Sequence, residues 1–413
     1  MQNRKQPRIL LVIPNLGRGG AQKVFLDQLD FYSLHFETIG CVFNWNDSFP
    51  SDQRSNIVSL DVPAGNNFFQ KIFFFLKRIR RLRQIKKKYR IDFSISHLEG
   101  ADYVNVISGY SGKIFCWIHG TKTGDQNISG LIGWIRKRIL IPLIYDKCNL
   151  VITVSKGIRN ELISEFRLKE SRIKTIYNAF DLTEIGNKSS VPLKKEVDLL
   201  FGPTPILITH CRFAKQKNLS SLLRIFHSIK KIVKCKLIIL GDGEERATLL
   251  ELCEDLALSN YNVWGSLKFS EVCDVYFFGH QVNPYAFLTR AKLYISTSLW
   301  EGFPLSLGEA MICGLPVISS DCMTGPREIM NIELGDPAPV SSPYFTPYGI
   351  LMPLTDSPQS LSLWAQTIIN LLKDESAVQQ MRNKGKSRMA AYDRGTVTLQ
   401  WLEIINEAYN TNN

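Results

Sequence analysis

Short apolar runs alternate with longer helical patterns along the whole chain, and this alternation constrains the fold more than any other feature. Such alternation is typical of parallel sheets covered by helices. Strands are expected in two series. The first series comprises residues 9–13, 38–43, 93–96, 114–118 and 150–154, and the second comprises residues 206–209, 236–240, 275–278, 293–296 and 316–319. The expected fold is therefore α/β, with two doubly wound parallel sheets.

The two series predict two domains, which a length of 413 residues also favours. A linker is expected at residues 187–205, because this stretch carries Pro192, Pro203 and Pro205 without a sustained apolar period. The first domain is then expected over residues 1–186 and the second over residues 206–396. Residues 361–409 have a helical pattern, and the end of this segment, from about residue 397 to 413, is expected to join the first domain.

Composition narrows the partners and the compartment only in part. The net charge of +12 indicates anionic partners, but nucleic acid, acidic phospholipid and nucleotide diphosphate meet that condition equally well. The nine cysteines include no C-x-x-C pair, which favours buried free thiols in a reducing compartment. A polar, basic start argues against a signal peptide. No apolar stretch approaches the roughly 20 residues that cross a bilayer, so a soluble or peripheral protein is expected.

A glycine-rich segment follows the first expected strand, where a helix is expected to begin. Gly17, Gly19 and Gly20 would let backbone N–H groups approach an anion at the positive end of that helix. A phosphate-binding loop is one interpretation, and a tight turn after a buried strand is the other. The dinucleotide pattern G-x-G-x-x-G fails at Gln22, and no G-K-[ST] follows, which disfavours NAD and Walker-type sites.

Four charged residues in the second domain predict a site for a phosphorylated sugar. Arg212 and Lys217 follow the first strand of that domain, where they can clamp a diphosphate or form a solvated basic turn. Glu301 lies in a Gly-Pro loop, and Glu309 lies eight residues later in the following helix. A loop carboxylate can meet sugar hydroxyls. A carboxylate about two turns along the helix returns to the same face and can reach a ribose diol.

These motifs resemble the retaining glycosyltransferases of the GT-B type, which have two Rossmann-like domains facing across a cleft. The resemblance is specifically to the family 4 group, which builds bacterial polysaccharides and lipid-linked glycans. The matching stretches are residues 17–24, 117–120, 151–162, 176–181, 212–218, 240–244, 279–285 and 296–320. The most specific of them is the pair of glutamates with seven residues between them, Glu301 and Glu309.

The resemblance implies a catalytic set and a donor-binding set. The catalytic residues are His119, near the donor sugar, with Glu301, Arg212 and Lys217; a core histidine is the other interpretation of His119. The donor-binding residues fall into four groups: two glycines that face the phosphates, two cations, four residues of a segment that resembles the base-recognition loop, and residues of the E-x7-E segment. In full they are Gly19, Gly20, Arg212, Lys217, Gly279, His280, Gln281, Asn283, Glu301, Gly302, Phe303, Pro304, Leu305 and Glu309.

The reaction that these residues suit develops negative charge on a departing diphosphate. Because no D-x-D metal motif appears, Arg212 and Lys217 are inferred to stabilise that charge, and no metal or cofactor is expected. The expected donor is a nucleotide sugar, with a UDP-sugar favoured, that carries a hexose or N-acetylhexosamine. The expected acceptor is a saccharide, such as a lipid-linked glycan for lipopolysaccharide or capsule. A non-catalytic basic module and a sugar-nucleotide epimerase of the same architecture are the alternatives, and no nucleic-acid motif is found.

A basic amphipathic helix is expected at residues 68–90. Its apolar residues recur at three or four residue steps, and it contains no acid. It is interpreted either as a domain helix with a solvated cationic face or as a helix that also contacts anionic lipid headgroups. The expected contacts are Lys77, Arg78, Arg81, Lys86, Lys87 and Lys88. On the second interpretation, and with a reducing compartment, the protein is expected in the cytoplasm, peripheral to the cytoplasmic face of the inner membrane.

The segment at residues 259–274 departs from the family pattern, because it is longer than in typical members. It contains Trp264 and Lys268. It lies just before the expected base-recognition loop, so the base of the nucleotide stays open at this point.

Overall fold

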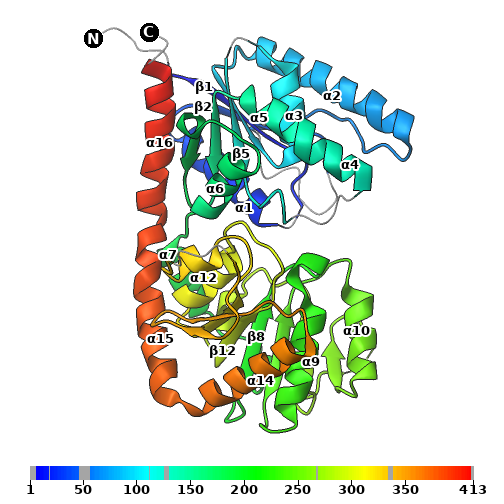
Figure 1. The fold of residues 1–413 in the computed structure, drawn as a ribbon, viewed down its shortest axis with the longest axis vertical. Coiled ribbons are helices and arrows are strands. Elements are labelled where there is room, and N and C mark those ends of the chain that lie inside the picture. Colours follow the sequence, from blue (N-terminus) through cyan, green and yellow to red (C-terminus); the bar gives the residue numbers. More distant parts are fainter. Residues whose placement is uncertain are drawn as a thin grey trace. The chain divides into compact units, whose positions relative to one another are not determined.

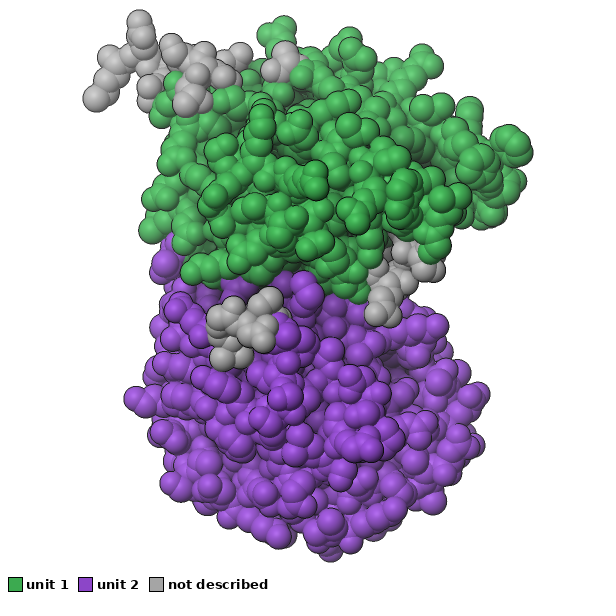
Figure 2. All heavy atoms as spheres, in the orientation of Figure 1, with its two compact units in different colours: residues 1–178, 397–413 green, residues 179–396 purple. Residues whose placement is uncertain are grey.

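The structure is a computed structural model that describes residues 6–17, 19–45, 56–110, 112–124, 130–266, 268–333 and 338–410. The chain separates into two compact units. Unit 1 comprises residues 1–178 and 397–413, and unit 2 comprises residues 179–396 (Figure 2). Each unit is an α/β layer structure with its own sheet and its own helices (Figure 1).

Unit 1 is built on a seven-stranded parallel sheet with the order β3-β2-β1-β4-β5-β6-β7. Its strands are β1 (Arg8–Ile13), β2 (Glu37–Val42), β3 (Ile57–Ser59), β4 (Phe93–His97), β5 (Lys113–Ile118), β6 (Leu150–Thr153) and β7 (Ile173–Thr175). Its helices are α1 (Gly20–Ser33), α2 (Phe68–Lys88), α3 (Glu99–Ser108), α4 (Gly130–Ile135), α5 (Ile141–Asp146) and α6 (Lys156–Ser164). A π-helical turn, Arg136–Leu140, joins α4 to α5.

Unit 2 is built on an eight-stranded sheet with the order β10-β11-β9-β8-β12-β13-β15-β14, in which only β14 pairs antiparallel. Its strands are β8 (Ile206–His210), β9 (Lys236–Leu240), β10 (Asn260–Asn262), β11 (Val275–Phe277), β12 (Leu293–Ser296), β13 (Val317–Ser320), β14 (Tyr344–Phe345) and β15 (Ile350–Met352). Its helices are α7 (Leu182–Ser189), α8 (Lys195–Asp198), α9 (Leu219–Lys230), α10 (Arg246–Asp255), α11 (Tyr285–Leu288), α12 (Leu305–Ile312), α13 (Pro326–Ile329), α14 (Pro358–Lys373) and α15 (Glu375–Arg388).

The α/β class and both parallel sheets are confirmed, because every strand expected from an apolar run is present. The strands β1, β8, β9 and β12 are buried along almost their whole length, as parallel strands covered on both faces must be. No apolar run predicted β3, β7, β10, β14 and β15. Each of these has only two or three residues, too few for a periodic pattern.

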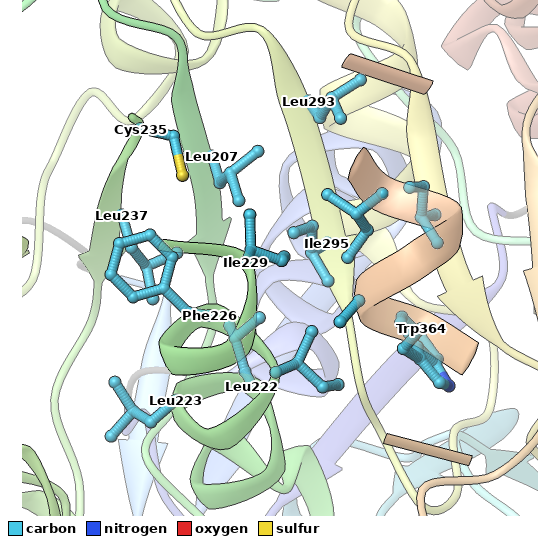
Figure 3. Packing of buried hydrophobic residues seen from close by; sticks show 14 of the residues in the cluster. Leu207, Leu222, Leu223, Phe226, Ile229, Cys235, Leu237, Leu293, Ile295 and Trp364 are labelled. Carbon is cyan, nitrogen blue, oxygen red and sulfur yellow. The ribbon is translucent and has the colours of Figure 1, made fainter. Parts of the chain in front are cut away.

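The core of unit 2 explains the central position of β8 and β12. Helices α9 and α14 pack against each other over these strands, and Figure 3 shows Ile229 of α9 between the strand residues Leu207 and Ile295. Phe226 of α9 and Trp364 of α14 belong to the same buried cluster. All five side chains are buried. This packing fixes the ends of β8 and β12, where the charged residues of the sequence analysis follow.

The unit boundary falls between residues 178 and 179, before the linker that was expected at residues 187–205. That stretch contains the end of α7 and the short helix α8, and both belong to unit 2. The last helix, α16 (Arg394–Asn410), starts in unit 2 and continues as part of unit 1. In unit 1 its Trp401 is buried against Tyr32, and the ring centroids lie 6.2 Å apart.

Helix α2 corresponds to the expected basic helix, but one of its predicted membrane contacts is wrong. Lys86 is buried, and its Nζ donates to the carbonyl oxygens of Asn105 at 2.8 Å and Gly109 at 3.2 Å. These carbonyls lie at the end of α3, where the helix dipole favours a cation. Arg78 and Arg81 also donate to backbone carbonyls, those of residues 60–63. Lys87 and Lys88 are exposed.

Burial lowers the pKa of Lys86 from 10.5 to about 7, although three nearby cysteines oppose the shift. Below pH 7 both the folded and the unfolded chain carry the proton. Between pH 7 and about pH 10.5, only the unfolded chain keeps the proton. The contribution of Lys86 to the free energy of unfolding therefore rises with pH over this window. Relative to Lys86→Met, the stability of the natural chain is expected to increase by up to about 1 kcal/mol per pH unit between pH 7 and 9.

The measurement is the urea midpoint of both proteins at pH 6.5, 7.5 and 8.5. Lys87→Met is the control, because Lys87 is the exposed neighbour on the same helix. A difference between the natural chain and Lys86→Met that stays constant over this range would contradict the shifted titration.

The segment at residues 259–274 adds an edge strand to unit 2. Its β10 pairs with β11, and Trp264 packs at the edge of the core with its ring centroid 6.1 Å from that of Phe213. Asp274 fastens the end of the segment by accepting a hydrogen bond from the Ser259 hydroxyl at 2.7 Å. The segment therefore has a structural role in widening the sheet.

Two further expectations concern the cysteines and membrane-spanning helices. All nine cysteines are free thiols. Among the described residues, no helix combines the length and the apolar character that a membrane crossing requires.

Candidate functional site

The loop between β8 and α9 carries both predicted cations at the carboxyl edge of the unit 2 sheet. It leaves β8 at His210 and passes through a 3-10 turn, Lys215–Lys217. Asn218 then takes the left-handed conformation, and its side chain donates to the Thr355 hydroxyl at 2.7 Å. The hydroxyl of Thr297 donates to the carbonyl oxygen of Lys217 at 3.1 Å. These contacts fix the backbone from which the Lys217 side chain projects.

Lys217 and Glu301 form an ion pair in which the Lys217 Nζ lies 2.5 Å from the Glu301 Oε1. Both side chains are largely buried, with 18% and 7% of their surfaces exposed. Burial alone would lower the pKa of Lys217, but the Glu301 carboxylate outweighs it, so that the pKa is raised and the ammonium stays charged. Gln216 holds the adjacent backbone by donating to the carbonyl oxygen of Trp300 at 2.6 Å.

The Glu301 loop is anchored through its backbone. The Glu301 N–H donates to the carbonyl oxygen of Met323 at 2.6 Å, and the Thr324 N–H donates to the carbonyl oxygen of Glu301 at 3.1 Å. Phe303 is buried against Tyr392, and the ring centroids lie 5.1 Å apart. Pro304 then caps α12 without a side-chain acceptor for the helix start. The positive end of α12 is therefore not neutralised by its own cap.

Glu309 lies in α12 and is joined to β8. Its Oε2 lies 2.8 Å from the Nε2 of His210, and its Oε1 accepts a hydrogen bond from the Tyr285 hydroxyl at 3.1 Å. Glu309 is buried, with 7% of its surface exposed. A buried carboxylate needs such partners, and they fix its direction.

Arg212 does not contact the Lys217–Glu301 pair. Its side chain is 65% exposed, and its Nη2 lies 3.0 Å from the Oε2 of Glu244, in the turn after β9. An ion pair this exposed contributes little to stability, and the guanidinium is accessible to an anion. The strands β9, β8 and β12 are neighbours in the sheet, so Glu244, Arg212, Lys217 and Glu301 all follow strands that end at one edge.

The predicted base-recognition loop follows β11. Gly279 has a φ of +67°, and its carbonyl oxygen accepts a hydrogen bond from the Gly241 N–H at 2.8 Å. The side chains of Gln281 and Asn283 donate to the backbone carbonyls of Phe278 at 2.6 Å and Lys188 at 2.8 Å. His280 is exposed. Two of the side chains that were expected to contact a base therefore donate to backbone carbonyls of the chain itself.

In unit 1 the predicted phosphate-facing residues lie at the start of α1. Gly19 is the N-cap residue of this helix, with no side-chain cap, and Gly20 is its first residue. Both are exposed. The start of α1 is therefore exposed at these two glycines, and a phosphate contact there stays a prediction.

His119 follows β5 and is half-buried. Its Nε2 lies 2.9 Å from the Nδ1 of His97, the last residue of β4. Burial, with a smaller effect from the nearby Lys122, lowers the pKa of His119 to about 3. The ring is therefore neutral at physiological pH.

The structure brings Lys217 together with Glu301 and leaves Arg212 beside Glu244. Sequence reasoning missed the residues that hold this set: His210 and Tyr285 on Glu309, Gln216 beside Glu301, and His97 on His119. Only His210 carried a usable signal, because it ends the strand that precedes Arg212.

Two family models match successive parts of the chain. The model described as glycosyl transferases group 1 matches residues 192–388, and the model described as glycosyltransferase family 4 matches residues 19–184. Together they cover every described strand of both sheets except β1, and all the charged residues described above. The chain belongs to the GT-B glycosyltransferases and is a sugar-transferring enzyme of glycan biosynthesis.

Curated relatives match over most of their length. The chain is 28% identical over 353 residues to an uncharacterized glycosyltransferase of Methanocaldococcus jannaschii, covering 81% of this chain and 84% of that protein. It is 26% identical over 406 residues to the N-acetylgalactosamine-N,N'-diacetylbacillosaminyl-diphospho-undecaprenol 4-alpha-N-acetylgalactosaminyltransferase of Campylobacter jejuni, covering 96% of this chain and 98% of that protein.

Solved structures show the same fold. The HepE protein of Anabaena in complex with UDP-glucose matches with a TM-score of 0.74 at 17% identity, over 97% of this chain and 99% of that chain. The sucrose-phosphate synthase of Thermosynechococcus elongatus matches with a TM-score of 0.75 at 16% identity, over 98% and 100%.

Proposed function

We propose that this enzyme transfers a hexose or N-acetylhexosamine, with retention of configuration, from a UDP-sugar to a lipid-linked glycan. The observation that carries the donor assignment is the buried Lys217–Glu301 pair at the ends of β8 and β12. An anionic diphosphate can draw Lys217 toward itself while Glu301 turns to the sugar hydroxyls. The complex of HepE with UDP-glucose supports the choice of nucleotide.

The side chains have separate roles in this proposal. Breaking the bond between sugar and phosphate leaves negative charge on the diphosphate, and fixed cations stabilise that charge in the transition state. Lys217 and Arg212 supply the cations. Glu309, held by His210 and Tyr285, accepts hydrogen bonds from the ribose hydroxyls. The start of α12 adds the helix dipole.

Donor binding is the first test. UDP-glucose, UDP-N-acetylglucosamine, UDP-galactose and GDP-mannose are compared by thermal shift, because a ligand at 100 times its Kd stabilises the folded state by about 2.7 kcal/mol. One UDP-sugar is expected to raise the Tm, equally with and without EDTA, since two side-chain cations stand in place of a metal. Stabilisation by GDP-mannose alone, or only with a divalent cation, would contradict the proposal. Product analysis by NMR then shows whether the new bond keeps the donor's configuration.

The acceptor assignment is supported by unit 1. The Campylobacter relative is named for a diphospho-undecaprenol acceptor, a lipid-linked saccharide. In this chain, apolar side chains of α2 and of the segment from α4 to α5 are exposed, and α3 packs against both α2 and α5. They are Phe68, Phe69, Ile72, Phe73, Leu76, Leu131, Ile132, Trp134, Ile135, Ile139, Leu140 and Leu143. With the exposed Lys87 and Lys88, this surface suits an anionic membrane.

Membrane binding is expected to depend on both kinds of residue. The double variants Phe69→Ser with Phe73→Ser, and Lys87→Glu with Lys88→Glu, are each expected to lower partitioning into phosphatidylglycerol vesicles by about tenfold or more, since each basic residue contributes roughly 1 kcal/mol. The control is Lys231→Glu with Lys234→Glu, an equal charge change on exposed residues of unit 2. An equal loss of binding in the control variant would reject a specific surface on unit 1. Binding to neutral vesicles that the phenylalanine variant leaves unchanged would also reject it.

A further inference from the structure

His97 and His119 meet edge to edge in unit 1. The Nδ1 of His97 lies 2.9 Å from the Nε2 of His119, the ring centroids are 5.1 Å apart and the ring planes differ by 27°. At a fixed N···N distance, the ring centroids are farthest apart when both nitrogens lie on the line that joins the centroids. The observed separation is close to that limit. The two nitrogens therefore lie on the line between the rings, which is the direction of a hydrogen bond in the ring planes.

The His97 ring is held on its other sides. It is fully buried, the Trp117 ring lies nearly parallel to it at an angle of 14°, and the Phe25 ring meets it edge-on with the centroids 5.6 Å apart. Its Nε2 is buried, and in the described part of the chain this atom has no hydrogen-bond partner. Among the described residues, the His97 ring has one polar contact, the one with His119.

A neutral imidazole carries one N–H, so only one of the two rings donates in this contact. If His119 donated, His97 would carry its proton on the buried Nε2 and leave an N–H without an acceptor. If His97 donates from Nδ1, the buried Nε2 is only an unfilled acceptor. Orphaned N–H groups are rarer in folded proteins than unfilled acceptors, so the second arrangement is favoured.

We infer that His97 is a positioning residue that fixes the tautomer of His119, so that His119 carries its proton on Nδ1 and presents an N–H donor to the substrate. This inference rests on the proposed function for the role of His119 but not for the tautomer itself. Burial keeps both pKa values below the usual range for histidine, which agrees with two neutral rings.

The consequence is a directional contact. Within the described residues the Nδ1 of His119 has no protein partner, and the residue is half-buried, so this atom can face a ligand. A neutral N–H donor suits a sugar hydroxyl or a phosphate oxygen and cannot act as a base from that nitrogen. The group that His119 recognises is therefore a hydrogen-bond acceptor.

The direct test is nitrogen NMR of the full chain labelled with 15N-histidine. The chain has six histidines, so signals can be assigned with His97→Asn and His119→Asn. We expect His97 and His119 each to show a protonated Nδ1 and an unprotonated Nε2. A protonated Nε2 in His119 would overturn the inference. This measurement needs neither donor nor acceptor, so its outcome is independent of the proposed function.

Activity provides a second readout. The amide nitrogen of Asn overlays the Nδ1 of histidine, whereas that of Gln overlays the Nε2. His97→Asn is therefore expected to keep kcat near that of the natural chain, and His97→Gln is expected to lower kcat about tenfold with little change in KM, the scale of losing an orienting partner. Equal losses in both variants, together with a lower Tm in both, would show that His97 only fills space. An Asn variant that is slower than the Gln variant would also contradict the inference.

Discussion

Replacing Lys217 by Ala is expected to lower the rate of sugar transfer by about tenfold to a thousandfold, the range for loss of one fixed electrostatic partner. Lys217 is the largely buried cation of the candidate site, and its neighbour Glu301 keeps it charged. Without it, the side-chain cation that remains for the departing diphosphate is the exposed Arg212, beside the start of α12. The measurement is kcat/KM with the donor identified by thermal shift.

Three variants separate this role from a general effect on the loop. Lys215→Ala removes an exposed cation from the same turn and is expected to leave kcat/KM within about twofold, because exposed charges contribute little. Glu301→Ala is expected to be as slow as Lys217→Ala, and the double variant is expected to be only slightly slower than either, since the two residues act as a unit. Additive losses, or near-normal rates in both single variants, would remove the pair from the site.

Replacing Gly241 by Ala is expected to lower the stability of unit 2 by about 2 to 4 kcal/mol, through a clash and through backbone strain. Gly241 has a φ of +136°, and a Cβ there would lie 1.8 Å from the carbonyl oxygen of Cys211. In the same turn, the carbonyl oxygen of Asp242 accepts a hydrogen bond from the Phe213 N–H at 2.9 Å. This bond holds the loop that carries Arg212. For a unit of this size, the calorimetric Tm is expected to fall by about 5 to 15 °C.

Two other glycines of unit 2 serve as matched controls. A Cβ at Gly314 meets nothing within 4 Å, but φ is +74°, so Gly314→Ala is expected to show strain alone, at about 1 kcal/mol. Gly186 is exposed within α7, where a Cβ would meet nothing within 4 Å and φ does not lie in the left-handed region. Gly186→Ala is expected to stabilise the helix by about 0.5 to 1 kcal/mol. If all three variants behaved alike, the close approach at Gly241 would not be the cause.

The Lys86 and Arg78 side chains mark the limit of reasoning from a helical pattern. The sequence places both on the basic helix, where periodicity assigns long cations to the solvent side. The structure instead directs them to backbone carbonyls, and Lys86 is buried among residues of α3. Long side chains reach acceptors that lie beyond their own helix face, and these acceptors come from other elements.

The sequence by itself determined the ten strands that are marked by apolar runs, their division into two sheets and the positions of Arg212, Lys217, Glu301 and Glu309 after strand ends, because each of these signals is contained in a short stretch of chain. Only the tertiary structure decided which charges pair. The Lys217–Glu301 and His210–Glu309 contacts join residues 84 and 99 positions apart, and the His97–His119 contact depends on the register of β4 against β5. Packing of whole elements sets such distances, so no local pattern encodes them.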